Sequence, residues 1–280
     1  INNDMRKALL TIYFLFQCAS AQYTHTGIDR KISFPDIKGY KTLSCDLHTH
    51  TVFSDGSVWP SIRVAEANKD GLDAIAVTEH IEYQSYKEDI PHPDRNRSYD
   101  LTKKYAKGSD LMVIAGTEIT KKMPPGHANA IFVKDVNKIM NDDYMKSYEA
   151  ARKQGAFTFW NHPHWIGQRK DASVKVFDEV EELINKRLLH GIEVTNERTY
   201  SDQAIQAALD HDLTMIGTSD VHDLVDWDYK IPEGGHRPVT LVFSKRKNLK
   251  DLKRSLFQGR TVVWYNNILI GKNEWMTPLI

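Results

Sequence analysis

Residues 46–56 read DLHTHTVFSDG, and this stretch decides the fold. Residues 41–47 have the composition of a short strand, and side chains two positions apart on a strand point to the same face. His48 and His50 are therefore expected to lie side by side, where both imidazoles can bind one metal ion. The Asp55-Gly56 pair predicts a turn that carries a carboxylate. A chance HxH pair in a strand is the alternative.

Composition limits the class of protein. The chain has 280 residues, of which 41% are hydrophobic and 26% are charged, as in an ordinary globular protein. This length suits one barrel-sized domain better than two small ones. The 37 basic and 37 acidic side chains balance. No electrostatic case therefore exists for non-specific binding of nucleic acid, and a small-molecule partner is expected instead.

The first residues have the order of an export signal. The basic MRK at 5–7 precedes an apolar run at 8–16, and the small residues ASA follow at 19–21. The run is shorter than the ~20 apolar residues that cross a bilayer. We therefore expect residues 1–21 to be a signal peptide and residues 22–280 to be a single exported domain, periplasmic or secreted, without a transmembrane span.

The two cysteines have different expected fates. Cys18 follows LFQ at 15–17, which also suits a lipoprotein processing site, although Gln17 stands where a small residue is usual. Lipidation at Cys18 stays open. Removal of residues 1–21 leaves Cys45 alone, so the mature chain can form no intrachain disulfide. Its stability is expected to come from the core and from bound metal.

Short β-rich runs alternate with helical patterns between residues 42 and 218, which predicts parallel strands joined by crossover helices. After this region, a strand, a helix and a second strand could close the bottom of a barrel or cover a sheet edge. The expected strands are 42–47, 74–77, 111–117, 128–133, 157–160, 191–195 and 214–218, followed by 239–243 and 261–265. The expected helices are 60–69, 99–107, 142–154, 173–188, 201–210 and 249–258.

Six histidines and three acidic residues lie close to the ends of these strands. The C-terminal ends of parallel barrel strands open on one face, where ligands converge. Four ligands satisfy one zinc ion, so this set predicts about two or three ions that share a bridging carboxylate. Nitrogen and oxygen ligands without thiolate suit Zn, Mn or Fe. The predicted ligands are His48, His50, Asp55, His80, Glu118, His127, His162, Asp220 and His222.

In this order, the motifs TEH at 78–80, GTE at 116–118, NHP at 161–163 and SDVH at 219–222 resemble the PHP family, named for polymerase and histidinol phosphatase. The resemblance covers roughly residues 43–265. It implies an α/β fold, a distorted seven-stranded (β/α)7 barrel with a short C-terminal αβ extension. It also implies a metal-dependent phosphoesterase.

The resemblance divides the ligands among the ions. Glu118 would bridge two of them, and Glu79, which stands where the family usually has Asp, has no assigned role. The first ion would be held by His48, His50, Glu118 and Asp220, the second by Glu118, His127 and His162, and the third by Asp55, His80 and His222.

Four longer sequence segments resemble a subgroup of secreted bacterial PHP proteins described as phosphodiesterases: MPPGHANAIF, FWNHP, GIEVTNE and HRPVTLVF. The implied reaction is attack of a metal-bridging hydroxide on phosphorus, with Glu118 as the bridging ligand and no protein nucleophile. We therefore expect a secreted hydrolase that cleaves a small phosphodiester.

Three alternatives remain. The first is a phosphomonoesterase of the histidinol-phosphatase type. The second is an amidohydrolase-like metal hydrolase, a class that also begins with HxH but usually has eight strands and lacks the SDG, TEH and SDxH motifs found here. The third is a catalytically silent metal module, which the complete ligand set disfavours.

Phosphate contacts are expected from Arg237, Lys121 and His236. A guanidinium matches phosphate oxygens bidentately, which makes Arg237 the first choice, with a surface salt bridge as its alternative. Glu193 could accept a hydrogen bond from a metal-bound histidine. Core packing is favoured over a position in the pocket wall for Trp160 and Trp165, and His190 is expected to face solvent.

Overall fold

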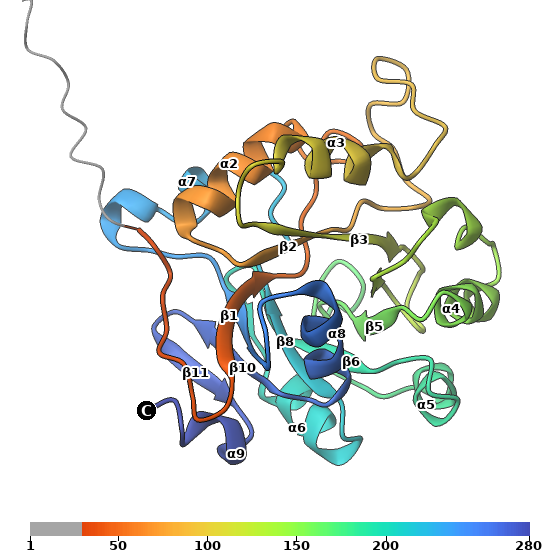
Figure 1. The fold of residues 1–280 in the computed structure, drawn as a ribbon. Coiled ribbons are helices and arrows are strands. Elements are labelled where there is room, and N and C mark those ends of the chain that lie inside the picture. The colour runs from red at the N-terminus through yellow and green to blue at the C-terminus, as the bar shows by residue number, and fades with distance from the viewer. Residues whose placement is uncertain (1–29) are drawn as a thin grey trace, which may run out of the picture. The chain divides into compact units, whose positions relative to one another are not determined.

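Strands and helices alternate through residues 30–280, the part of the chain that the computed structural model describes (Figure 1). The predictions for the signal peptide and for Cys18 lie outside the described residues. The strands are β1 (Lys41–Asp46), β2 (Ala74–Val77), β3 (Met112–Ile119), β4 (Ala128–Ile131), β5 (Phe157–Trp160), β6 (Gly191–Asn196), β7 (Thr199–Tyr200), β8 (Thr214–Thr218), β9 (Val239–Ser244), β10 (Thr261–Tyr265) and β11 (Ile268–Gly271). The α-helices are α2 (Pro60–Asp70), α3 (Arg97–Tyr105), α4 (Tyr144–Lys153), α5 (Asp178–Asn185), α6 (Asp202–Asp210), α7 (Val225–Asp228), α8 (Leu249–Phe257) and α9 (Asn273–Met276).

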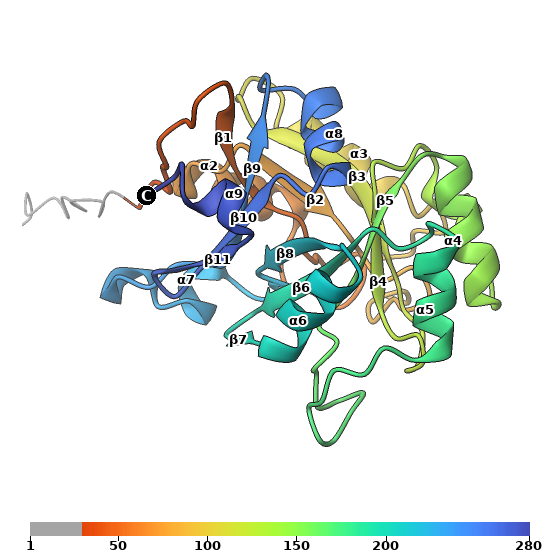
Figure 2. The same cartoon turned by 90° about the horizontal axis from the view of Figure 1, so that it is seen from below.

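The strands form one mixed, curled sheet, which confirms the α/β class (Figure 2). Its order is β11-β10-β9-β1-β2-β3-β4-β5-β6-β7, and β8 pairs with β6 outside this path. The strand count therefore exceeds the seven of the predicted barrel. The pairs β1/β2, β2/β3, β5/β6 and β6/β8 are parallel, as predicted.

The prediction of an all-parallel barrel is wrong at β4, which runs antiparallel to both β3 and β5. Residues 120–127 join β3 to β4, and this connection is shorter than the roughly dozen residues that a parallel crossover needs. The chain therefore turns back. As a result, the N-terminal end of β4 lies beside the C-terminal end of β3.

The C-terminal segment covers one edge of the sheet and also closes the bottom of the barrel, the two possibilities that the sequence left open. Strand β9 pairs antiparallel with β1 and covers that edge, and β10 and β11 extend the sheet further. Helix α8 buries Leu252 and Leu256 in the cluster that holds Cys45, Ala74 and Phe157. Because Ala74 and Phe157 begin β2 and β5, α8 covers the N-terminal ends of the strands and leaves their C-terminal ends open.

Local sequence explains where several helices begin and end. Side chains of Asp143, Ser201 and Asn248 accept hydrogen bonds from backbone N–H groups at the starts of α4, α6 and α8. Helix α2 begins at Pro60 and ends at Asp70, and its C-cap residue Gly71 has a φ of 71°, which suits glycine. Within residues 30–280, no helix combines the length and the apolar character needed to cross a membrane.

The ends of β1 and β8 meet although the two strands are not paired along their length. The Asp220 N–H donates to the His48 carbonyl at 3.0 Å, and Thr49 and Val221 form an isolated parallel bridge. The HTH segment and the SDVH segment therefore lie next to each other. We call this end of the sheet, formed by the C-terminal ends of β1, β2, β3, β5, β6 and β8, the rim.

Candidate metal centre

All nine predicted ligands lie at the rim. His48 and His50 follow β1, and Asp55 belongs to the loop after them. His127 immediately precedes β4, and it reaches the rim only because β4 is antiparallel to β3. His48 and His50 are fully buried. The other seven ligands line a cavity of about 480 Å³: Asp55, His80, Glu118, His127, His162, Asp220 and His222.

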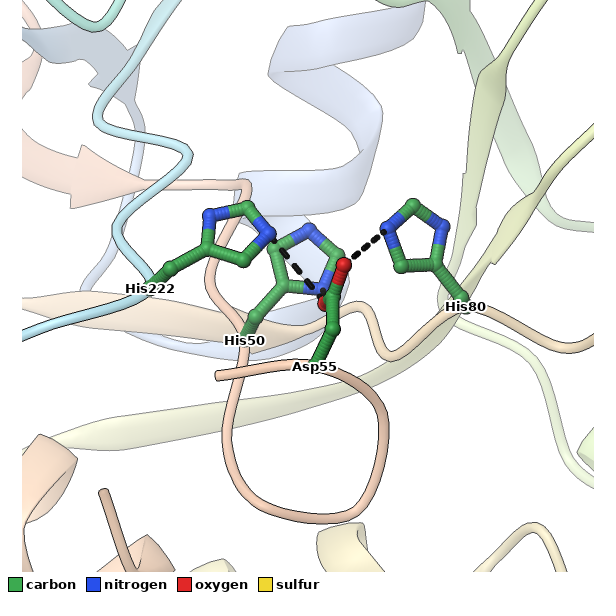
Figure 3. A group of neighbouring side chains, drawn as sticks. All are labelled: His50, Asp55, His80 and His222. Atoms are coloured by element: carbon green, nitrogen blue, oxygen red, sulfur yellow. Dashed lines mark ion pairs between the residues drawn. The ribbon is translucent and has the colours of Figure 1, made fainter. Parts of the chain in front are cut away.

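Ligand atoms gather in three groups, within each of which they lie inside 4.8 Å of one another. In one group, the Asp55 carboxylate lies between two imidazoles, 3.2 Å from His222 Nε2 and 3.3 Å from His80 Nε2 (Figure 3). The groups are His50, Asp55, His80 and His222; His48, His50 and Asp220; and His80, Glu118 and His127.

These groups differ from the implied division among the ions. His50 also belongs to the Asp55 group, and His80 joins Glu118 and His127. His162 lies outside all three groups, although its Nε2 is 3.4 Å from Glu118 Oε1.

Glu118 occupies the centre of the cluster, and its two oxygens face different histidines. Oε1 lies 3.0 Å from His127 Nδ1, on the same side as His162. Oε2 lies 2.6 Å from His80 Nδ1 and 3.7 Å from His50 Nε2. A carboxylate in this position can contribute one oxygen to each of two neighbouring cation sites.

The cluster strongly perturbs its titratable groups. Burial alone would raise the pKa of Glu118, but the imidazoles of His80, His127 and His48 hold this pKa well below its usual range. Burial lowers the pKa of His50 to about 3, and the positive charge of His222 acts in the same direction. The pKa of His80 rises to about 11 in spite of burial, because Glu118 and Asp55 stabilise its charged form. Such opposed shifts are typical of functional sites.

The donor atoms fit divalent cations. Asp55 Oδ1, Glu118 Oε2 and Asp220 Oδ1 are buried at the cluster and accept no hydrogen bond. Buried carboxylate oxygens without a partner are costly, and a cation among them would compensate their charge. Imidazole and carboxylate donors suit a transition metal, and Cys45, the free cysteine of the described residues, lies in the core. These clusters, together with the resemblance noted in the sequence, indicate divalent metal binding.

A second layer of side chains orients the ligands. Glu193 Oε1 lies 2.8 Å from His48 Nδ1, so His48 presents Nε2 to the cluster. The other Glu193 oxygen accepts from the His162 N–H at 2.7 Å and from Asn196 Nδ2 at 2.9 Å. The role suggested for Glu193 from the sequence therefore agrees with its contacts.

Two asparagines were not predicted to contribute. Asn161 Nδ2 donates to Glu118 Oε1 at 2.8 Å, and Asn196 Nδ2 lies 3.2 Å from Asp220 Oδ2. The signal was present in the NHP and VTNE motifs, where each amide adjoins a ligand or follows a strand. An asparagine has no charge, so the sequence alone does not distinguish one that orients a ligand from one with another structural role.

The sequence assigned no role to Glu79, and the structure shows which groups its side chain contacts. Its carboxylate accepts hydrogen bonds from the Thr51 N–H and from the hydroxyls of Thr51, Ser54 and Ser98. The Ser54 hydroxyl also lies 3.1 Å from His50 Nδ1. Glu79 therefore fixes the loop after β1 and, through Ser54, the orientation of His50.

Two ligands have unusual backbone conformations. His162 has φ of 28° and Asp220 has φ of 48°, in a region that non-glycine residues rarely adopt. Such strain persists where surrounding contacts impose it, often at functional sites. For His162 the backbone N–H bond to Glu193 is one such contact.

The structure gives no support for the predicted phosphate contact of Arg237. Its side chain is only 1% exposed and is held by two carboxylates. Nη1 lies 3.0 Å from Asp46 Oδ2, and Nη2 lies 2.6 Å from Asp70 Oδ2. These partners turn the guanidinium into a buried link between β1 and α2.

Lys121 and His236 are also engaged away from the cluster. Lys121 Nζ lies 2.8 Å from Glu82 Oε1 and donates to the Asn141 carbonyl at 2.7 Å. His236 stacks on Trp264 with ring centroids 3.4 Å apart, and it lines a separate cavity of about 400 Å³. Neither side chain lines the metal cavity, so the structure gives no support for their predicted phosphate contacts.

Comparisons with known proteins agree with the geometry. The PHP domain matches residues 46–211. A crystal structure of a two-domain protein from Bacteroides vulgatus, containing a predicted PHP-like metal-dependent phosphoesterase, has a TM-score of 0.87 and 46% identity, covering 91% of this chain and 74% of that one. PsfC from Pseudomonas syringae has a TM-score of 0.53 at 16% identity, covers 81% of this chain and 92% of its own, and shows the fold alone.

A curated relative, an uncharacterized protein of Methanocaldococcus jannaschii, is 41% identical over 80 residues, which are 29% of this chain and 34% of that protein. The chain therefore spans about a third of the length of the curated relative that it matches. The matched domain covers the HTH, TEH, GTE and NHP motifs, and the rim brings their side chains together. On these grounds the chain belongs to the PHP domain family.

Proposed function

We propose that this chain is a metal-dependent phosphoesterase that hydrolyses a small phosphodiester. The observation that carries the proposal is the position of Glu118, whose two oxygens face separate histidines in a cavity of about 480 Å³. The 46% identical neighbour from Bacteroides vulgatus, which contains a predicted PHP-like metal-dependent phosphoesterase, supports the same reaction class.

Divalent ions such as Zn, Mn or Fe, when bound, would lower the pKa of a water molecule and offset the charge on the phosphoryl oxygens. The chain itself supplies orientation. Glu193 holds His48, Asn161 holds Glu118 and Asn196 holds Asp220 before any substrate arrives. Ligands fixed in this way need little reorganisation during the reaction.

The charge of the cavity supports a diester over a monoester. Among the described residues that line the cavity, none is a lysine or an arginine. The two cations expected there, Lys121 and Arg237, are paired with other groups. A monoanionic diester requires less compensating positive charge than a dianionic monoester, so the diester suits this lining better.

The test compares kcat/KM for 4-nitrophenyl methyl phosphate and 4-nitrophenyl phosphate at one pH and one metal content. We expect the diester to react faster. A tenfold advantage for the monoester, equivalent to ~1.4 kcal/mol of transition-state stabilisation, would replace the diesterase by a phosphatase. Glu118→Gln is the control, because loss of the central charge should abolish turnover of both esters and thereby exclude a contaminating enzyme.

We also propose that the protein is exported, on the basis of the order of residues 5–21. Mass spectrometry of the protein purified from its native cells should place the mature N-terminus at or near Gln22, or at a lipidated Cys18. A cytoplasmic chain that begins at Met5 would contradict both forms of this proposal.

A further inference from the structure

Trp165 lies in the wall of the metal cavity, contrary to the core position favoured from the sequence. It is 47% exposed, whereas Trp160, the other candidate, is 1% exposed and belongs to the core. Ile166, which is 67% exposed, and Ala172 line the same cavity. Trp165, Ile166 and Ala172 therefore give the cavity an apolar side.

The Trp165 indole is held in place. Its centroid lies 5.3 Å from the His162 ring and 5.9 Å from the His127 ring, with interplanar angles of 70° and 52°. A Cβ built on Gly167 would lie 2.5 Å from indole Cζ2. The ring therefore rests directly on the Gly167 backbone, where only glycine leaves room for it.

The backbone around Trp165 is also ordered by hydrogen bonds. The Trp165 N–H donates to the His162 carbonyl at 2.9 Å, and the Trp165 carbonyl accepts from the N–H groups of Gln168 and Arg169 at 3.0 and 2.9 Å. Gln168 Nε2 donates to the Lys121 carbonyl at 3.1 Å. The indole thus has a defined position relative to His127 and His162 before any ligand binds.

Polar groups line the rest of this cavity. His164 Nε2 lies 2.9 Å from Thr199 Oγ1, and both residues line the cavity together with Asn196 and Glu197. A cavity with an exposed aromatic side chain and a few polar groups is typical of small-molecule sites. Trp165 and Ile166 are neighbouring exposed apolar side chains beside the cluster, and such contiguous apolar surface often marks a binding site.

We propose that Trp165 stacks on a flat aromatic ring carried by one alcohol of the ester, so that this wall determines substrate specificity. The inference rests on the proposed function, since the ring is placed next to a phosphoryl group at the cluster. Indole stacks on flat rings through its face, and this contact favours a planar ring over a puckered ring of similar size. Ile166 adds apolar contact that does not discriminate between the two.

The probes are methyl(phenyl)phosphinate and cyclohexyl(methyl)phosphinate, two monoanions whose P–C bonds resist hydrolysis. Titration calorimetry of the metal-loaded protein gives the Kd of each. We expect the phenyl compound to bind about ten times more tightly than the cyclohexyl compound, as stacking energies of this kind allow. Trp165→Leu should remove this preference, and Trp165→Phe should restore most of it.

Gly167→Ala provides an independent variant, because its added methyl group would displace an unaltered indole. It should weaken binding of the phenyl compound and leave the metal content unchanged. Trp227→Leu is the matched control, since Trp227 is 72% exposed on α7 and is not among the residues that line the cavity. This control should bind both phosphinates as the wild type does.

Equal affinity of the wild type for the two rings, or no binding of either, would overturn the stacking proposal. So would an equal loss of affinity for both compounds in Trp165→Leu and Gly167→Ala. Failure of the proposed function gives a different result. In that case the loaded wild type would hydrolyse neither 4-nitrophenyl ester, while its preference for the phenyl phosphinate would persist.

Discussion

The ligands at the rim are held by side chains that do not face the cavity: Glu193 for His48, Asn161 for Glu118 and Ser54 for His50. The sequence predicted all nine ligands because imidazoles and carboxylates are recognisable near strand ends. It could not predict most of the second layer, because a buried asparagine or serine has many structural uses. These orienting contacts are therefore where mutations test the geometry best.

Glu193→Gln should weaken metal binding without unfolding the protein. The substitution keeps the size of the side chain but removes the charge that fixes His48 through Nδ1. Loss of such an outer carboxylate typically costs about 10–100-fold in metal affinity. Competition with a chelator measures this change, and saturating metal should recover much of the activity.

Glu233→Gln is the control for this prediction, because the Glu233 side chain is 72% exposed. Unchanged metal affinity in Glu193→Gln would mean that Glu193 has only a structural role.

His190 is not solvent-facing, contrary to the expectation from sequence. Its ring lies between Phe157 and Phe257, with centroid distances of 5.6 and 4.7 Å, and its Nδ1 accepts a hydrogen bond from the Thr158 N–H at 3.2 Å. Burial lowers the pKa of His190 to about 4, from an ordinary value of 6.5. The folded state therefore favours the neutral imidazole.

This shift predicts a loss of stability in acid. Between pH 6.5 and about 4 the unfolded chain binds a proton at His190 that the folded chain does not. The free energy of unfolding should therefore fall as the pH falls, by up to ~1.4 kcal/mol per pH unit from this group. In His190→Asn, which retains an acceptor for Thr158, the decrease should be smaller. Urea unfolding of chelator-treated wild type and variant at pH 7 and pH 5 tests this, and parallel losses would contradict it.

Strands and helices that are determined by their own local sequence were predicted with the correct bounds more often than those that depend on distant parts of the chain. The bounds of β2, β5, β8 and β10 are as predicted, since short runs of β-branched and aromatic residues mark buried strands. Strands β7 and β11, which lie at the two ends of the strand order, were not predicted. Helix α5 is shorter than predicted, because residues 173–177 are not helical and the helix runs only from Asp178 to Asn185.

The burial of Arg237 could not be predicted from local sequence, because it depends on how separate strands and helices pack together. The residue precedes β9, while its partners Asp46 and Asp70 end β1 and α2. These partners are far away in the sequence, so nothing near Arg237 indicates that it is buried. The guanidinium and the two carboxylates together connect β1, α2 and the residues just before β9.

Arg237→Ala should destabilise the protein by about 3–5 kcal/mol, because it leaves buried carboxylates without their cation. Guanidinium unfolding measures the loss. Arg246→Ala is the control, since the Arg246 side chain is 74% exposed and solvent screens its pairing with Asp251, so little change in stability is expected. An unfolding free energy near that of the wild type, combined with a raised KM, would instead restore the substrate contact predicted from sequence.

For the molecule as a whole, the curled sheet brings ligands from both ends of the domain to one cavity. Position 48 meets position 220 because β1 and β8 converge, and His127 joins them because β4 reverses direction. The rim rule for parallel strands predicted this convergence. It could not predict which ligands share a group, since distances between loop side chains depend on packing throughout the fold. The sharing of His50 and His80 between two groups each is one feature that the sequence did not reveal.

The clustered carboxylates and imidazoles are expected to bind metal. The most direct measurement is elemental analysis of purified protein, produced and handled with Zn, Mn and Fe supplied, with Glu118→Gln measured in parallel. We predict about two or three transition-metal ions per chain, the number that a ligand set of this size can satisfy, and fewer in the variant. One ion or none in the wild type would contradict the account.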